Sequence, residues 1–200
     1  METRPPAWAL IGPALAGLVA VGLSTAPLGR TWHAIEGALG LAPARMLMFV
    51  LIYPVVAAAT SIIGVLLGRR SPNAVGIPAI VLMVVGLALT TLTPTPAVLL
   101  AGRAVTGLGA GAVVGTVVAI ALHQGRQRGR ALAIVAGVAA FALVAGLFFG
   151  WVGSTMLNWR WVFLAALPVT LLALFATIVA GIVVLTQRAG RPAPPAPMGR

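Results

Sequence analysis

Six long apolar segments, separated by short breaks, are the feature of this sequence that most restricts its fold. They cover residues 8–30, 46–67, 74–92, 97–122, 131–152 and 161–185. About 20 apolar residues suffice for an α-helix to cross the hydrocarbon core of a bilayer, and a helix satisfies its own backbone hydrogen bonds in lipid. The pattern therefore predicts an all-α membrane protein with six transmembrane helices. The first segment is interpreted as a retained helix, because hydrophobic segments of similar length keep recurring after it.

The scarcity of charge supports the same interpretation. Only 8% of the residues are charged and 60% are hydrophobic, whereas a soluble domain carries roughly 25% charged residues. A net charge of +11 would suggest a nucleic-acid partner in a soluble protein. Most of the arginines, however, lie in the breaks between apolar segments. We therefore expect a lipid bilayer around the chain and no nucleic acid bound to it.

The placement of arginine predicts the orientation in the membrane. If residues 1–7 are cytoplasmic, the inner side holds nine arginines and the outer side holds three. Cytoplasmic loops carry an excess of positive residues, so both ends are predicted to lie inside. The inner set is Arg4, Arg69, Arg70, Arg126, Arg128, Arg130, Arg188, Arg191 and Arg200, and the outer set is Arg30, Arg45 and Arg160.

Two further expectations concern the tail and the source of the chain. The proline-rich segment 188–200 is predicted to be a disordered cytoplasmic tail. The basic set consists of arginine without lysine, and alanine, valine, glycine and proline are abundant. This composition suggests a GC-rich bacterial genome, and we accordingly expect a multi-pass protein of the bacterial cell membrane.

Small residues recur with helical spacing in two of the segments. Gly107, Gly111 and Gly115 are four residues apart in the fourth segment, and Gly146 and Gly150 repeat this spacing in the fifth. Faces of this kind let helix backbones approach closely in lipid. The pattern predicts tight helix packing, and a moving, gate-like contact is the alternative.

The sequence offers little chemistry for catalysis. It has no cysteine and only two acidic residues, Glu2 and Glu36. Enzymes and metal sites need clustered His, Asp, Glu, Ser or Cys side chains. We therefore expect a protein that is not an enzyme and has neither a metal site nor a cofactor.

Four motifs follow one another along the second half of the chain. They are LLAGRAVTGLGAG from Leu99, RGRALAI from Arg128, GLFFG from Gly146 and NWRWVFLAALP from Asn158. In this order they resemble the N-terminal six-helix half of a major facilitator superfamily transporter, in particular the drug:proton antiporter branch with 14 spans. Arg103, Gly107 and Gly109 fall on key positions of the fourth-span signature of that family.

The sequence departs from the family pattern at several places. Ser24 stands where the antiporter branch carries an aspartate, and Thr106 stands where the family usually has glutamine. In the loop after the second span, marked by Gly64, Arg69 and Arg70, Gly68 replaces the gating aspartate. The family also has 12 or 14 spans, whereas six are predicted here.

The resemblance implies an architecture and a function. The six helices would form two three-helix inverted repeats, which is half of a major facilitator fold, with spans 1 and 4 facing a central cavity. Small-molecule transport, such as drug or metabolite efflux, is implied, with a homodimer or a separate C-terminal half completing the transporter. The alternative is a degenerate or truncated membrane protein that does not transport. The substrate is not indicated.

Arg103 is the most informative residue, because an arginine inside a span is costly and by default functional. We expect it to face the bundle interior or water and to contact substrate or take part in coupling, with Ser24 and Thr106 as further candidates. The alternative is that its side chain snorkels to the outer end of the span. No acid lies in any predicted span, so a proton-coupling group would have to come from a partner.

Overall fold

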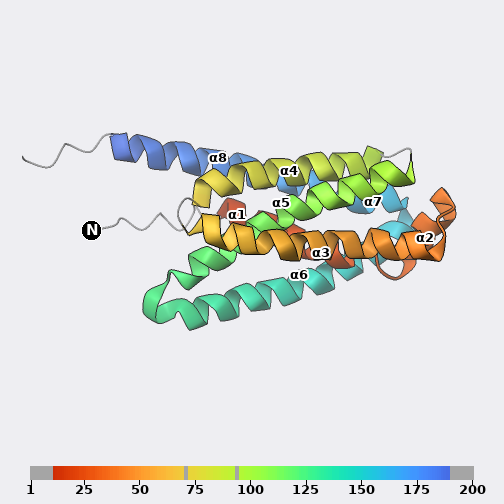
Figure 1. The fold of residues 1–200 in the computed structure, drawn as a ribbon, viewed down its shortest axis with the longest axis horizontal. Helices are drawn as coiled ribbons and strands as arrows, with labels where there is room; N and C mark the ends of the chain where they lie inside the picture. Colours follow the sequence, from red (N-terminus) through yellow and green to blue (C-terminus); the bar gives the residue numbers. More distant parts are fainter. Residues whose placement is uncertain (1–10, 70–71, 93–94, 190–200) are drawn as a thin grey trace, which may run out of the picture.

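Long helices run side by side along the molecule, as the computed structural model shows (Figure 1). The structure describes residues 11–69, 72–92 and 95–189, and these contain helices and no strand. The helices are α1 (Ile11–Thr25), α2 (Arg30–Leu39), α3 (Pro43–Gly68), α4 (Pro72–Leu92), α5 (Pro96–Leu122), α6 (Arg128–Met156), α7 (Trp159–Leu164) and α8 (Ala166–Ala189), with a short 3-10 turn, η2 (Gly125–Gln127), between α5 and α6.

Five segments of the described residues are long and apolar enough to cross a bilayer. They are Pro43–Gly68, Ala74–Leu92, Pro96–Leu122, Arg128–Met156 and Trp159–Val183. The pair of α1 and α2, which is bent by 71°, raises the number to six if it is counted as one span. The prediction of an all-α membrane protein is thus confirmed.

The first span differs from its prediction, which ran over residues 8–30. Residues 8–10 lie outside the described part of the chain, and α1 ends at Thr25. Pro27 follows two residues later, a position where proline commonly stops a helix, and Gly29 adopts a positive φ of 66° that favours glycine. The chain therefore turns before residue 30, and the expected loop after it contains the helix α2.

The last span is interrupted near its beginning. The prediction was one segment over 161–185, and Trp159–Val183 is indeed one candidate span, but within it α7 ends at Leu164 and α8 begins at Ala166. Pro168 lacks the amide hydrogen that would bond to the carbonyl of Leu164, and its ring would collide with that carbonyl in a regular helix. The break therefore falls within the turn that precedes Pro168, where the missing hydrogen bond and the proline ring act.

The spans form an N-terminal and a C-terminal group of three, and the first helix of each group packs mainly against the other group. Helix α1 packs mainly against α6 and α8, which are the second and third spans of the C-terminal triplet. Helix α5, the first span of that triplet, packs mainly against α3 and α4 of the first triplet. Since three crossings reverse the chain direction, the second triplet is inverted relative to the first. This is the repeat arrangement of one half of a major facilitator fold.

Some predictions fall on residues that the structure does not describe. Residues 1–7, Arg70 and residues 190–200 lie outside the described ranges. Helix α8 continues to Ala189, so residues 188 and 189 of the predicted disordered tail are helical. The remainder of that tail stays a prediction.

Candidate functional site

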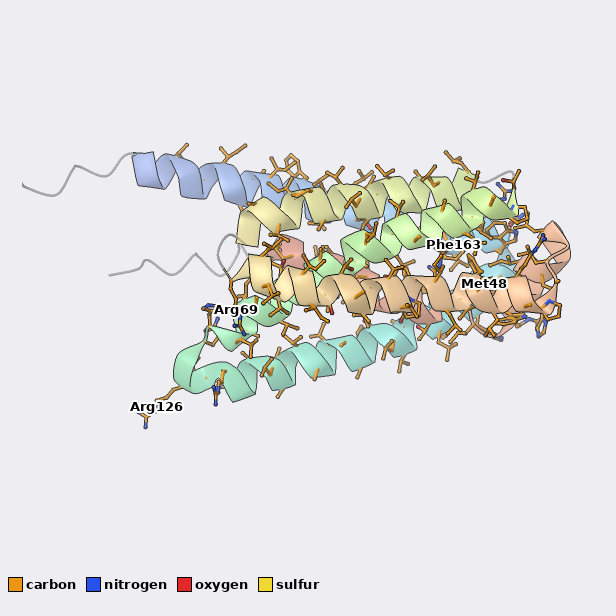
Figure 2. The ribbon with its side chains drawn as sticks, viewed as in Figure 1. Met48, Arg69, Arg126 and Phe163 are labelled. Atoms are coloured by element: carbon orange, nitrogen blue, oxygen red, sulfur yellow. The ribbon has the colours of Figure 1, made fainter. Side chains whose placement is uncertain are left out.

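Arg103 lies inside the bundle. It is on α5, its side chain is 1% exposed, and it is the largest of the fully buried side chains. One of its neighbours, Phe163, lies towards the end of the molecule that carries α2, whereas Arg69 and Arg126 lie at the opposite end (Figure 2). The side chain therefore reaches neither lipid nor the surface, and it does not snorkel.

Three aromatic rings surround the guanidinium group. Its Cζ atom lies 4.4 Å from the ring centroid of Tyr53, 5.2 Å from that of Phe49 and 5.6 Å from that of Phe163. A cation within about 6 Å of a ring centroid is attracted by the electron-rich face of the ring. Phe49 and Phe163 also contact each other edge to face, with centroids 6.5 Å apart. Rings from α3 and α7 thus replace the carboxylate that a buried arginine usually pairs with.

The hydrogen bonds of Arg103 are incomplete. Its Nη2 atom donates to the carbonyl oxygen of Leu23 on α1 at 3.1 Å. The Nε and Nη1 atoms are buried and have no hydrogen-bond partner among the described residues. A buried donor without a partner costs about 1–3 kcal/mol, and more for a charged group. Arg103 therefore joins α1, α3, α5 and α7 at an energetic cost.

The hydroxyl groups of Ser24 and Thr106 bond to their own helices, and among the described residues no hydrogen bond joins either of them to Arg103. The Ser24 hydroxyl donates to the carbonyl of Val21 at 2.6 Å, within its own helix. The Thr106 hydroxyl donates to the carbonyl of Gly102 at 2.7 Å, and its side chain packs against Gly86 of α4. The roles predicted for Ser24 and Thr106 in substrate contact or coupling stay predictions.

The acidic and histidine side chains of the described residues lie elsewhere. Glu36 on α2 has its carboxylate 3.6 Å from Nδ1 of His33, one turn away. His123 contacts the carbonyl of Ala119 through its Nδ1 atom at 2.7 Å. Within the described ranges, no three His, Cys, Asp or Glu residues group as metal ligands.

The aromatic residues of the site were not predicted from the sequence. Phe49 and Tyr53 are four residues apart, so they share one face of α3. This spacing, together with an arginine and no acid in any span, could have pointed to rings as the partners of the charge. Tyr53 also donates its hydroxyl hydrogen to the carbonyl of Ala20, which connects α3 to α1.

The Tyr53 contacts give a prediction that separates the ring from the hydroxyl. Tyr53→Phe should lower the free energy of unfolding by about 1 kcal/mol, the size of a hydrogen bond between membrane helices. Tyr53→Leu should cost more, because it also removes the ring nearest to Arg103, a contact of about 0.5–2 kcal/mol. Thermal unfolding of the two variants in detergent measures the difference. Equal losses in the two variants would contradict a role for the ring.

The glycines of α5 bring its backbone against α3. A Cβ atom at Gly107 would lie 2.8 Å from the carbonyl oxygen of Tyr53, and one at Gly115 would lie 2.8 Å from the amide nitrogen of Val65. On the facing helix, a Cβ at Gly64 would lie 2.6 Å from the carbonyl oxygen of Ala112. Gly111 makes the same kind of contact with Ala57. Gly64, expected in the cytoplasmic loop, therefore belongs to this interface.

A second small-residue face of α5 packs on α4. A Cβ atom at Gly102 would lie 2.7 Å from the Thr90 amide nitrogen, and one at Gly109 would lie 2.7 Å from the Met83 amide nitrogen. Helix α5 thus has close neighbours on two sides. This accounts for its being the most buried of the five single candidate spans, with 56% of its most apolar part buried.

The glycines of α6 approach α1. A Cβ atom at Gly146 would lie 2.7 Å from the carbonyl carbon of Gly22, and one at Gly150 would lie 3.0 Å from that of Ala26. The Thr31 hydroxyl of α2 also donates to the Gly150 carbonyl at 2.8 Å. The structure therefore places both predicted glycine faces at close helix contacts. The moving, gate-like contact stays a prediction.

An apolar bundle of two inverted helix triplets is the architecture of one half of a major facilitator fold. The chain matches the family model of the Major Facilitator Superfamily over residues 7–199. It belongs to this family.

Curated relatives agree with this assignment. An uncharacterized MFS-type transporter of Mycobacterium tuberculosis is 37% identical over 56% of this chain and 16% of its own length. Azole resistance protein 1 of Saccharomyces cerevisiae is 32% identical over 48% of this chain and 16% of its own length. Quinolone resistance protein NorB of Staphylococcus aureus is 31% identical over 48% of this chain and 21% of its own length. The chain thus matches only a small share of each relative.

Proposed function

We propose that this chain is the N-terminal six-helix half of a small-molecule transporter and that it works with a second six-helix half. The match of residues 7–199 to the Major Facilitator Superfamily carries this proposal. In such transporters the substrate site lies near the bilayer midplane between two halves that rock against each other. A single half can therefore supply one wall of the site, with α1 and α5 as the helices expected to face it.

The second half can be another copy of this chain. The two halves of a major facilitator transporter are related by an axis along the membrane normal, so both have the same orientation. With six crossings per chain, two copies inserted in the same orientation can adopt this relation. A separate C-terminal half is the other arrangement under this proposal.

Drug-like molecules are the substrate class that we propose. This rests on the names of relatives, which include an azole resistance protein, a quinolone resistance protein and an MFS-type efflux pump. Arg103 is the proposed substrate or coupling residue of this half. Since no acid lies in the described spans, a group that gains and loses a proton would come from the second half.

We further propose that the protein lies in a bacterial cell membrane with both ends in the cytoplasm. Arg69 and Arg126, on the arginine-rich side, lie at the same end of the bundle (Figure 2). The helix α2, which begins with Arg30, lies at the other end (Figure 1). An excess of arginine on one side indicates the cytoplasmic side.

Transport can be tested with the purified chain in proteoliposomes. We expect a fluorescent quinolone to cross the membrane faster than in empty vesicles, both with the chain and with two copies joined by a flexible linker. Arg103→Met is the matched inactive variant. If neither arrangement raised the flux of a quinolone or an azole, a second copy of this chain would be excluded as the second half. If a separate C-terminal half also gave no flux, the proposal would fail and the alternative of a membrane protein that does not transport would stand.

A further inference from the structure

The carbonyl group of Leu23 is the point at which Arg103 is hydrogen-bonded to α1. The Nη2 atom of the arginine donates to this carbonyl oxygen at 3.1 Å. Leu23 is 3% exposed and Arg103 is 1% exposed, and Pro27, which follows the end of α1, is buried as well. Because the chain's own helices already cover all three residues, the contact does not depend on what packs against the outside of the bundle.

Pro27 explains why this carbonyl is open to an arginine from another helix. In an α-helix each carbonyl accepts a hydrogen bond from the amide four residues later, and the Ala26 amide still donates in this way to the Gly22 carbonyl at 3.1 Å. The next bond of the series would run from residue 27 to Leu23, but proline has no amide hydrogen. The guanidinium group of Arg103 therefore stands in for one missing backbone donor.

The end of α1 also offers a negative partial charge to the arginine. Leu23 lies two residues before Thr25, where the helix ends. The C-terminal end of a helix carries about half a negative elementary charge, and basic side chains commonly bond to its last carbonyls. In the buried interior of the bundle such an attraction is stronger than it would be in water. The helix end can therefore act as the counter-charge of the buried cation.

Among the described residues, the Leu23 carbonyl is the one hydrogen-bond acceptor of Arg103. Ser24 follows Leu23 in α1, but its hydroxyl donates to the carbonyl of Val21 at 2.6 Å. The carboxylate of Glu36 is on α2, where it lies beside a histidine of the same helix. The aromatic rings attract the cation, but a ring accepts only a weak hydrogen bond. The carbonyl therefore fixes the direction of the guanidinium group.

We propose that Pro27 is a positioning residue for Arg103. Because it withholds an amide hydrogen from the Leu23 carbonyl, the end of α1 holds the Nη2 atom of the guanidinium group. The Nε and Nη1 atoms, which have no partner among the described residues, are then the donors left for a substrate or for a group of the second half. The use of Arg103 in transport rests on the proposed function, but the placement of its side chain can be measured without transport.

The position of Arg103 can be observed from Tyr53, which is the sole tyrosine of the chain. Its ring is the nearest of the three to the guanidinium group, at 4.4 Å, so meta-fluorotyrosine gives a single fluorine NMR signal beside the cation. Arg103→Met provides the chemical shift of this ring without the cation. Pro27→Ala supplies the missing amide hydrogen, which competes for the Leu23 carbonyl. We expect its signal to move from the wild-type position towards that of Arg103→Met.

A matched control carries lactic acid at position 27, joined through an ester bond. It removes the proline ring and leaves the same methyl side chain as alanine, but the ester oxygen carries no hydrogen. We expect its fluorine signal to stay close to that of the wild type. Glycine and glycolic acid at this position repeat the comparison with a smaller residue, should alanine disturb folding. Thermal unfolding in detergent checks that each variant is folded.

Two outcomes of the NMR comparison would overturn the proposal. Equal shifts in the amide and ester variants would mean that Pro27 only stiffens the chain after α1. A wild-type signal in Pro27→Ala would mean that Arg103 keeps its place when the amide is present. Quinolone flux in proteoliposomes is measured separately, and it should be lower for Pro27→Ala than for the ester variant. Absence of flux in the wild type would count against the proposed function, whereas the NMR comparison would still decide whether Pro27 positions Arg103.

Discussion

Replacing Gly111 with leucine is expected to prevent formation of the native bundle. A Cβ atom at this position would lie 2.8 Å from the carbonyl carbon of Ala57 and would overlap the Ala57 carbonyl oxygen and the Thr60 hydroxyl. The carbon and oxygen of the Ala57 carbonyl belong to the backbone of α3, so they cannot rotate away as a side chain can. Overpacking costs about 1–3 kcal/mol even where side chains can adjust, and we expect more than this range here.

Gly137→Leu is the matched control for this substitution. Gly137 is also in the middle of a span, but a Cβ there meets no atom within 4 Å. Both variants therefore add the same side chain to an apolar helix. Size-exclusion chromatography and thermal unfolding in detergent should show loss of the folded protein for Gly111→Leu and near wild-type behaviour for Gly137→Leu. A stable Gly111→Leu protein would contradict the close contact of α5 with α3.

The glycine spacing in the sequence predicts which face of α5 packs closely, but it cannot name the partner. Gly107, Gly111 and Gly115 repeat every fourth residue, which places them on one face whatever lies opposite. The partner, α3, follows only from the exchange of helices between the two triplets. The second face, which includes Gly102 and Gly109, does not follow the same repeat and was not predicted.

The boundaries of the spans show a similar limit. Hydropathy finds apolar segments but does not show where the chain bends within or after them. Helix α1 ends at Thr25 because of Pro27 and Gly29, and α7 ends at Leu164 because of Pro168. These residues are visible in the sequence. Proline is also tolerated inside spans, however, as Pro54 in α3 shows, so its effect depends on the neighbouring helices.

The surroundings of Arg103 were predictable only in part. Its place in an apolar segment indicates burial, because a charge is costly in lipid. The groups around it come from three other helices: the Leu23 carbonyl from α1, Tyr53 from α3 and Phe163 from α7. Residues so far apart in the sequence carry no local signal of their meeting. The fold of the whole bundle is needed to bring them together.

Arg103→Met is expected to give a protein that is at least as stable as the wild type and does not transport. The substitution removes a buried charge, which costs roughly 2.5–3.5 kcal/mol inside a span, and two buried donors without partners in the described residues. It also removes one hydrogen bond and the attraction to three rings, about 0.5–2 kcal/mol for each ring. Methionine partly restores the contacts with the rings, because its sulfur packs well against aromatic side chains.

Stability and flux must be measured on the same preparation, because together they separate structure from function. Arg103→Ala is the comparison variant, because it also removes the charge but leaves a cavity. Its free energy of unfolding should be about 2–5 kcal/mol lower than that of Arg103→Met. A stable Arg103→Met protein without quinolone flux would mean that the chain retains a costly charge for transport. A stable variant with wild-type flux would contradict this, since a charge that adds neither stability nor transport has no role in this half. A marked loss of stability in Arg103→Met would show instead that the three rings hold the bundle together through the cation.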